Sequence, residues 1–329
     1  MARRFALVLS LAICATFAAA QAPDWKALSD EAIAFYRQAD YERAEAAASK
    51  ALEAVVAALG ADHPTVATSA SNLATILEAR RRYPEAQALF ERALAVREKA
   101  LGPLHPLVAG TFNSLGSLYR AQGKLELAEP CFARALAIRE KALGPEHLDV
   151  ATSLNNLASV YRLQGKYAAA YPLYERALAI REKALGATHP EVAMTVNNLA
   201  ALQDAQDHFE EAEALYKRSL AIREQALGFQ HLDVAASMNS LGELYLAQRK
   251  YEKAEPLLKR AFDIRVKSLR PDDPDRRATQ LDLWTLHVSR GELALAEQYE
   301  QAGQITPTET QRRRLSIPMP SPKGTDPTR

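Results

Sequence analysis

Histidine side chains can ligate metals and transfer protons, and in this chain of 329 residues five of the seven histidines recur at one fixed spacing. They stand 42 residues apart, at His63, His105, His147, His189 and His231, and Asp273 occupies the next place. Equivalent residues of successive copies would lie about 10 Å apart, one layer of packed helices, which is too far to share a metal ion. His105 and His189 precede a proline and a helical run, as N-caps do. The series therefore predicts helix N-caps and no metal site.

Other motifs of catalysis are absent from the sequence. Gly123-Lys124 and Gly165-Lys166 lack the spacing of a phosphate-binding loop and fall between two helical runs. The zinc-protease, serine-hydrolase and paired-cysteine motifs do not occur. Cys131 lies on an apolar helix face, which favours a core residue over a reactive thiol. We therefore expect no enzyme, no cofactor and no small-molecule substrate.

Asparagine also recurs at the 42-residue step, within helical runs where it is a mediocre helix former. The main column comprises Asn113, Asn155, Asn197 and Asn239, and Asn72, Asn156 and Asn198 run beside it. A side-chain amide can hydrogen-bond an extended peptide backbone, or it can bond between adjacent copies and stabilise their stacking. Both interpretations remain open. Arg120 and Arg162 stand seven residues further along than Asn113 and Asn155, about two helical turns, and complete the candidate peptide-binding surface.

A second polar column is made of arginines. It comprises Arg97, Arg139, Arg181, Arg223 and Arg265, again 42 residues apart. Two functions are compatible with this spacing. The arginines could line an inner surface, or each could anchor one copy to the next.

These columns belong to a repeated unit, seen most clearly from His147 to Gly186. Apolar residues recur there at three- and four-residue steps, which is helical spacing. Gln164-Gly165-Lys166 interrupts the pattern, a second helical run follows, and Gly186 ends it. Each copy is therefore expected to be an antiparallel helix pair, and stacked pairs would bury the faces that one pair leaves open. The sequence predicts an all-α fold.

The repeat array is expected to span residues 23–303. Residues 25–60 form a degenerate copy that suits an N-terminal cap, full copies extend from about 63 to 270, and residues 273–303 suit a C-terminal cap. Residues 304–329 are rich in proline and basic residues, which predicts a disordered tail. The array without its tail and leader is mildly acidic, which argues against nucleic-acid binding.

The first 22 residues have the composition of a secretory signal peptide. Arg3 and Arg4 precede an apolar run that is short for a membrane span, and Ala18-Ala19-Ala20 supplies the small residues of a cleavage site. We expect cleavage after Ala20 and a secreted or periplasmic protein with no membrane span. The alternative is an uncleaved N-terminal segment that anchors the protein in a membrane.

The pattern inside each copy resembles the tetratricopeptide repeat. Leu115-Gly116-Ser117-Leu118-Tyr119, followed by Gly123, Ala128, Phe132 and Ala135, matches the family's spacing of small and large residues. The usual repeat has 34 residues. The 42-residue form, with LNNLA at 154–158 and ALAIREKALG at 177–186, looks like the kinesin light chain type. The resemblance covers about residues 25–303 and implies a right-handed α-solenoid.

In the family that this chain resembles, the first helices line a concave groove, and similar asparagines contact bound peptides. The resemblance therefore implies a non-catalytic scaffold that binds a peptide or protein segment in that groove. The alternative is a structural or spacer element of an envelope complex, docked through its ends or convex face. The predicted leader departs from a cytoplasmic motor subunit, so motor binding is not implied.

Overall fold

The computed structural model describes residues 24–303, so the predicted leader (1–22) and the predicted tail (304–329) lie outside the described residues. Within residues 24–303 the chain forms fourteen α-helices and no β-strand, which confirms the all-α class. Their bounds are α2 Trp25–Arg37, α3 Tyr41–Leu59, α4 Pro64–Ala79, α5 Tyr83–Leu101, α6 Pro106–Ala121, α7 Leu125–Leu143, α8 Leu148–Leu163, α9 Tyr167–Leu185, α10 Pro190–Asp204, α11 Phe209–Leu227, α12 Leu232–Ala247, α13 Tyr251–Ser268, α14 Pro274–Ser289 and α15 Leu293–Gly303.

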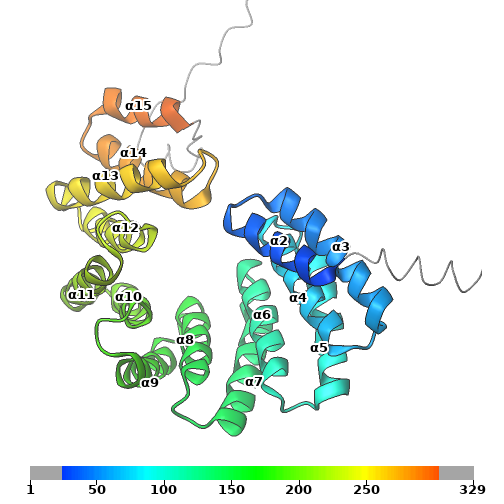
Figure 1. Ribbon diagram of the computed structural model, residues 1–329. Helices are drawn as coiled ribbons and strands as arrows, with labels where there is room; N and C mark the ends of the chain where they lie inside the picture. Colours follow the sequence, from blue (N-terminus) through cyan, green and yellow to red (C-terminus); the bar gives the residue numbers. More distant parts are fainter. Residues whose placement is uncertain (1–23, 304–329) are drawn as a thin grey trace, which may run out of the picture. The chain divides into compact units, whose positions relative to one another are not determined.

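The helices alternate in length along the chain. From α4 to α14 the first helix of each pair has 15 or 16 residues and the second has 18 or 19. The terminal helices are shorter, with 13 residues in α2 and 11 in α15. The chain divides into two compact units between Leu173 and Tyr174, within α9. In each unit a helix packs against the one that follows it, as Figure 1 shows for α6 and α7 and for α12 and α13.

The histidine column caps the first helices, as the sequence predicted. The Nδ1 atoms of His63, His105, His147, His189 and His231 accept a hydrogen bond from the backbone N–H two residues on, at 3.0–3.2 Å. Asp273 does the same for α14 through Oδ1, at 2.9 Å from the Asp275 N–H. The cap satisfies a free N–H group of the first turn, and it uses the Nδ1 atom of each ring.

The turn inside each pair has one residue in the left-handed region of backbone conformation. These residues are Ala39, Arg81, Gly123, Gly165, Asp207, Arg249 and Gly291, with φ between 56° and 78°. The Gly-Lys pairs at 123–124 and 165–166 therefore lie in inter-helix turns, as predicted. Glycine adopts this conformation without the steric cost that a side chain incurs.

The core repeats with the sequence. One column of alanines on the second helices is buried, comprising Ala86, Ala128, Ala170, Ala212, Ala254 and Ala296. A large side chain one turn along is buried beside each of the first five: Phe90, Phe132, Tyr174, Tyr216 and Leu258. Helix contact is closest where the facing residue is glycine, since a Cβ at Gly116 would lie 2.9 Å from the Phe132 ring. Cys131 packs against this core, and burial raises the pKa of its thiol.

Candidate functional site

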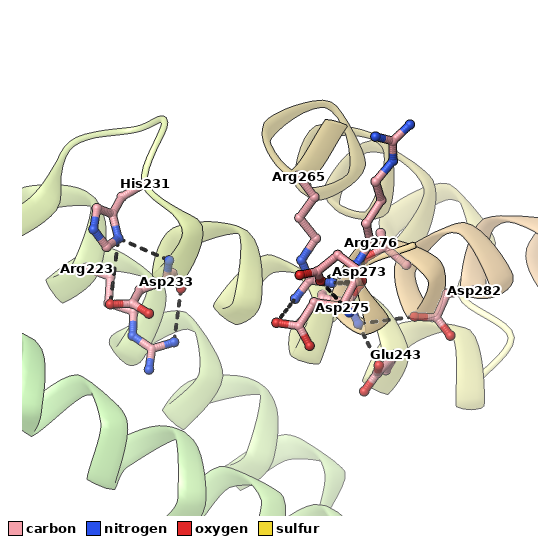
Figure 2. A network of polar contacts seen from close by, with 11 residues as sticks. Arg223, His231, Asp233, Glu243, Arg265, Asp273, Asp275, Arg276 and Asp282 are labelled. Atoms are coloured by element: carbon pink, nitrogen blue, oxygen red, sulfur yellow. Dashed lines mark hydrogen bonds and ion pairs between the residues drawn. The ribbon is translucent and has the colours of Figure 1, made fainter. Parts of the chain in front are cut away.

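The arginine column anchors each repeat to the next. Arg139 Nη1 donates to Ser153 Oγ at 2.8 Å and to the Asp149 carbonyl oxygen at 3.1 Å, both on α8. Arg223 does the same with Ser237 (2.7 Å) and the Asp233 carbonyl (3.0 Å) on α12. Figure 2 shows the last two members of the column, Arg223 and Arg265. Of the two interpretations left open by the sequence, the structure therefore supports anchoring.

The same geometry holds through the whole column. Each arginine donates to a carbonyl ten residues on and to a hydroxyl fourteen residues on, and all five side chains are between 1% and 9% exposed. Desolvation by burial lowers the pKa values of Arg97, Arg139, Arg181 and Arg223. A cation held in this way needs its hydrogen bonds, because an unpaired buried charge is costly.

The hydroxyl partners form a column that the sequence analysis missed. It comprises Thr111, Ser153, Thr195, Ser237 and Thr279, all buried and all 42 residues apart. Its signal was present in the sequence, since a threonine or serine follows every arginine of the column at a constant distance of fourteen residues.

The nine candidate binding residues all lie on the first helices of their pairs. Asn72 is on α4, Asn113 and Arg120 on α6, Asn155, Asn156 and Arg162 on α8, Asn197 and Asn198 on α10, and Asn239 on α12. Asn155 and Asn239 are buried, at 5% and 6% exposure, whereas the other seven are half-buried. The candidates therefore differ in how much of each side chain a partner could reach.

Two asparagines bond between consecutive repeats. Asn156 Nδ2 donates to Asn113 Oδ1 at 2.8 Å, from α8 to α6. Asn239 Nδ2 donates to Asp282 Oδ2 at 3.1 Å, from α12 to α14. Both pairs are separated by 43 residues, so a residue of the main column meets the second column of the next repeat. The asparagines thus take part in stacking at these two places, and peptide contact stays a prediction.

Asparagine amides retain hydrogen-bonding capacity beyond these contacts. The Asn113–Asn156 bond uses one acceptor and one of four amide hydrogens, which leaves the Asn113 NH2 group and the Asn156 oxygen. Within residues 24–303, Asn197 Oδ1 is buried and has no hydrogen-bond partner. In contrast, Asn239 uses both amide hydrogens, toward Glu243 and Asp282, and its oxygen accepts from Arg265.

Arg120 and Arg162 occupy equivalent positions of α6 and α8. Arg120 Nη1 makes a long hydrogen bond of 3.4 Å to Ser159 Oγ on α8. Arg162 Nε is buried, and it makes no hydrogen bond within the described part of the chain. Burial raises the pKa of Glu78, on α4, and the Arg120 charge opposes that rise. This part of the first unit therefore carries two half-buried guanidinium groups at equivalent positions.

The described residues contain no group of side chains typical of a metal centre. Among residues 24–303, no three histidine, cysteine, aspartate or glutamate side chains are grouped so that they could hold a metal ion. None of the helices of this part is long and apolar enough to cross a bilayer.

Comparison with known proteins agrees with the repeat geometry. The tetratricopeptide repeat model matches residues 26–99, 65–141, 107–170, 149–225 and 232–303. No curated protein gives a significant match to the sequence. The crystal structure of BtubC (BKLC) from P. vanneervenii is 28% identical, with a TM-score of 0.58 over 69% of this chain and 91% of that one.

Two further structures are similar. TPR-like repeats of the kinesin light chain type from Podosopora anserina are 29% identical, with a TM-score of 0.51 over 63% of this chain and 99% of theirs. The apo form of RapI shares the fold at 16% identity, with a TM-score of 0.64 over 89% of this chain and 99% of that one. With the family model matching most of the sequence, this chain belongs to the tetratricopeptide repeat family, whose members generally serve protein–protein interaction.

Proposed function

We propose that this protein is an exported, non-catalytic scaffold that binds an extended segment of a partner protein along the first helices of its repeats. In the first unit the proposed binding surface comprises Asn113, Arg120, Asn156 and Arg162, from α6 and α8. One observation carries the proposal: two half-buried arginines, Arg120 and Arg162, stand at equivalent positions of consecutive repeats.

The chemistry of this surface favours a segment with acidic side chains. Guanidinium groups bind carboxylates through charge-assisted hydrogen bonds, which are stronger than neutral ones. The remaining donors and acceptor of Asn113 and Asn156 can bond the segment's backbone, which needs both. Nothing in this arrangement requires the partner to be chemically changed, which suits a scaffold.

A photo-crosslinking experiment tests the proposal. Benzoylphenylalanine replaces Thr75, which is exposed on α4 and stands one repeat before Ser117 of α6. We expect adducts that map to one short segment of a partner. A synthetic peptide of that segment should bind at least about tenfold more weakly to the Arg120→Ala/Arg162→Ala variant, since each charge-assisted bond contributes about 1.5–3 kcal/mol. The helical melt of the variant should stay unchanged.

Two matched controls accompany this test. Benzoylphenylalanine at Ala133, exposed on α7, probes the second helices, and Arg134→Ala removes an exposed arginine there. Equal adducts from positions 75 and 133, or an affinity that the double arginine variant does not change, would show that the first helices are not the binding surface.

Export is the second part of the proposal and has its own test. Its support is the sequence of the first 22 residues, with their basic start, apolar run and alanine-rich end. N-terminal sequencing of protein purified from the native cells should find Gln21 as the first residue. Recovery of an intact Met1 from the mature protein would contradict cleavage and leave the anchored alternative.

A further inference from the structure

Two carboxyl groups meet between the last two repeats of the second unit. Glu243 of α12 and Asp282 of α14 both accept a hydrogen bond from Asn239 Nδ2, at 2.5 and 3.1 Å. Because one amide nitrogen reaches both, the two carboxyl groups lie beside each other, and their mutual repulsion is relieved when one of them carries a proton. Figure 2 shows the two side chains on either side of the contact between α12 and α14.

We propose that Glu243 and Asp282 share one proton across this contact and form a pH-dependent latch, which holds the last helix pair, α14 and α15, against the preceding pair. Below the titration range the shared proton joins the two carboxyl groups. Above it, two negative charges face each other across the repeat boundary, and the last pair opens more often.

The charged groups around the latch come from two other helices. Arg265 of α13 bonds the oxygen of Asn239 at 3.3 Å and attracts both carboxylates. Asp204 of α10 adds repulsion at Glu243. Arg265 also donates hydrogen bonds to the Thr279 hydroxyl and to the Asp275 carbonyl oxygen, as the other anchoring arginines do. Its charge is therefore not devoted to the two carboxyl groups alone.

The titration of the two carboxyl groups follows from this environment. Desolvation by the surrounding helices, followed by the charge of Asp282, raises the pKa of Glu243 from 4.5 to about 7. Burial also raises the pKa of Asp282. The hydrogen bond from Asn239 and the charge of Arg265 oppose the rise at Asp282, so we assign the shared proton to Glu243.

The direction of the pH effect is opposite to that of an ordinary ion-paired carboxylate. Between pH 4.5 and about 7 the folded state binds more protons at Glu243 than the unfolded state does. The latch is therefore fully effective below about pH 4.5 and is lost as the pH rises through about 7. Glu243 is exposed to solvent, which screens its charge, so we expect about a tenfold change in the opening equilibrium rather than the full effect of the pKa change.

Hydrogen exchange of the full chain, followed by mass spectrometry at pH 5 and pH 8, tests the latch. Protection factors correct for the intrinsic exchange rate at each pH. In the wild type, protection of α14 and α15 should fall about tenfold between pH 5 and pH 8. In Glu243→Gln, which cannot ionise at this position, most of this fall should be absent, and Asp282→Asn should lose most of it as well.

The comparison between variants isolates the carboxyl pair. Glu210→Gln, which removes an exposed carboxylate on α11, should behave as the wild type. His287 of α14 pairs with Glu292 at 2.7 Å in the wild type and in Glu243→Gln alike, so the test is the difference between these two proteins. Carboxyl carbon NMR gives a second measurement. The Glu243 signal is assigned as the one that is absent from the spectrum of Glu243→Gln, and in the wild type it should titrate near pH 7. A midpoint near 4.5, or the same loss of protection in Glu243→Gln as in the wild type, would overturn the proposal.

Discussion

We expect the Arg139→Ala variant to lose about 2–4 kcal/mol of its free energy of unfolding. The substitution removes both bonds from Nη1, to Ser153 Oγ and to the Asp149 carbonyl, and leaves a cavity where a long buried side chain was. One term acts in the opposite direction. Burial disfavours the charged form of Arg139, and this lowers its pKa, so removing the charge relieves some desolvation. The cavity and the unpaired oxygens outweigh that relief.

Urea denaturation followed by circular dichroism measures this loss. Arg134→Ala is the matched control, since Arg134 is exposed on the same helix and should change stability by less than about 0.5 kcal/mol. The double variant Arg139→Ala/Ser153→Ala should cost less than the two single variants together, because the two residues share one bond. A loss below about 1 kcal/mol for Arg139→Ala, or strict additivity with Ser153→Ala, would remove the anchoring role.

Helix boundaries could be predicted because their causes are local. A histidine or aspartate cap, a proline at the first position and a break at the inter-helix turn act within a few residues of chain. His105 and Asp273 were therefore assigned correctly from sequence, and Gly123 and Gly165 were placed in turns. The repeat itself gave the pairing of helices, because stacked copies of one unit bury the same face each time.

The contacts between polar columns could not be predicted in the same way. Aligning the copies groups equivalent residues, but the contact between repeats joins residues that are not equivalent. Asn113 meets Asn156, 43 residues away, and Arg139 meets Ser153, fourteen residues away. The rotation of one helix pair against the next decides which polar columns come into contact. That rotation cannot be deduced from the sequence alone. The alternatives for the arginine column were therefore equal until the structure was known.

The carboxyl pair is a break in two columns. Glu243 stands where other copies have Ser117, Ser159 or Ala201, and Asp282 stands where they have asparagine or serine. Each change alone resembles surface variation. Only the contact between α12 and α14 shows that the two changes meet. In a repeat protein, two neighbouring polar columns can each change residue type, one at a given repeat and the other at the next. Such a pair of changes therefore indicates a contact between the two altered residues.

The Gly116→Val variant should lose about 1–3 kcal/mol of stability, because the helix pair is packed too closely to accept a side chain there. A Cβ at this position would lie 2.9 Å from the Phe132 ring, and Phe132 is fully buried and cannot move aside. Gly110→Val is the matched control on the same helix, since a Cβ there has no heavy atom within 4 Å. It should be neutral or slightly stabilising, because valine is a better helix former than glycine. Urea titration of both variants measures the difference. Equal stability of the two would show that α6 and α7 can separate at Gly116 without cost, which a core packed around Phe132 does not allow.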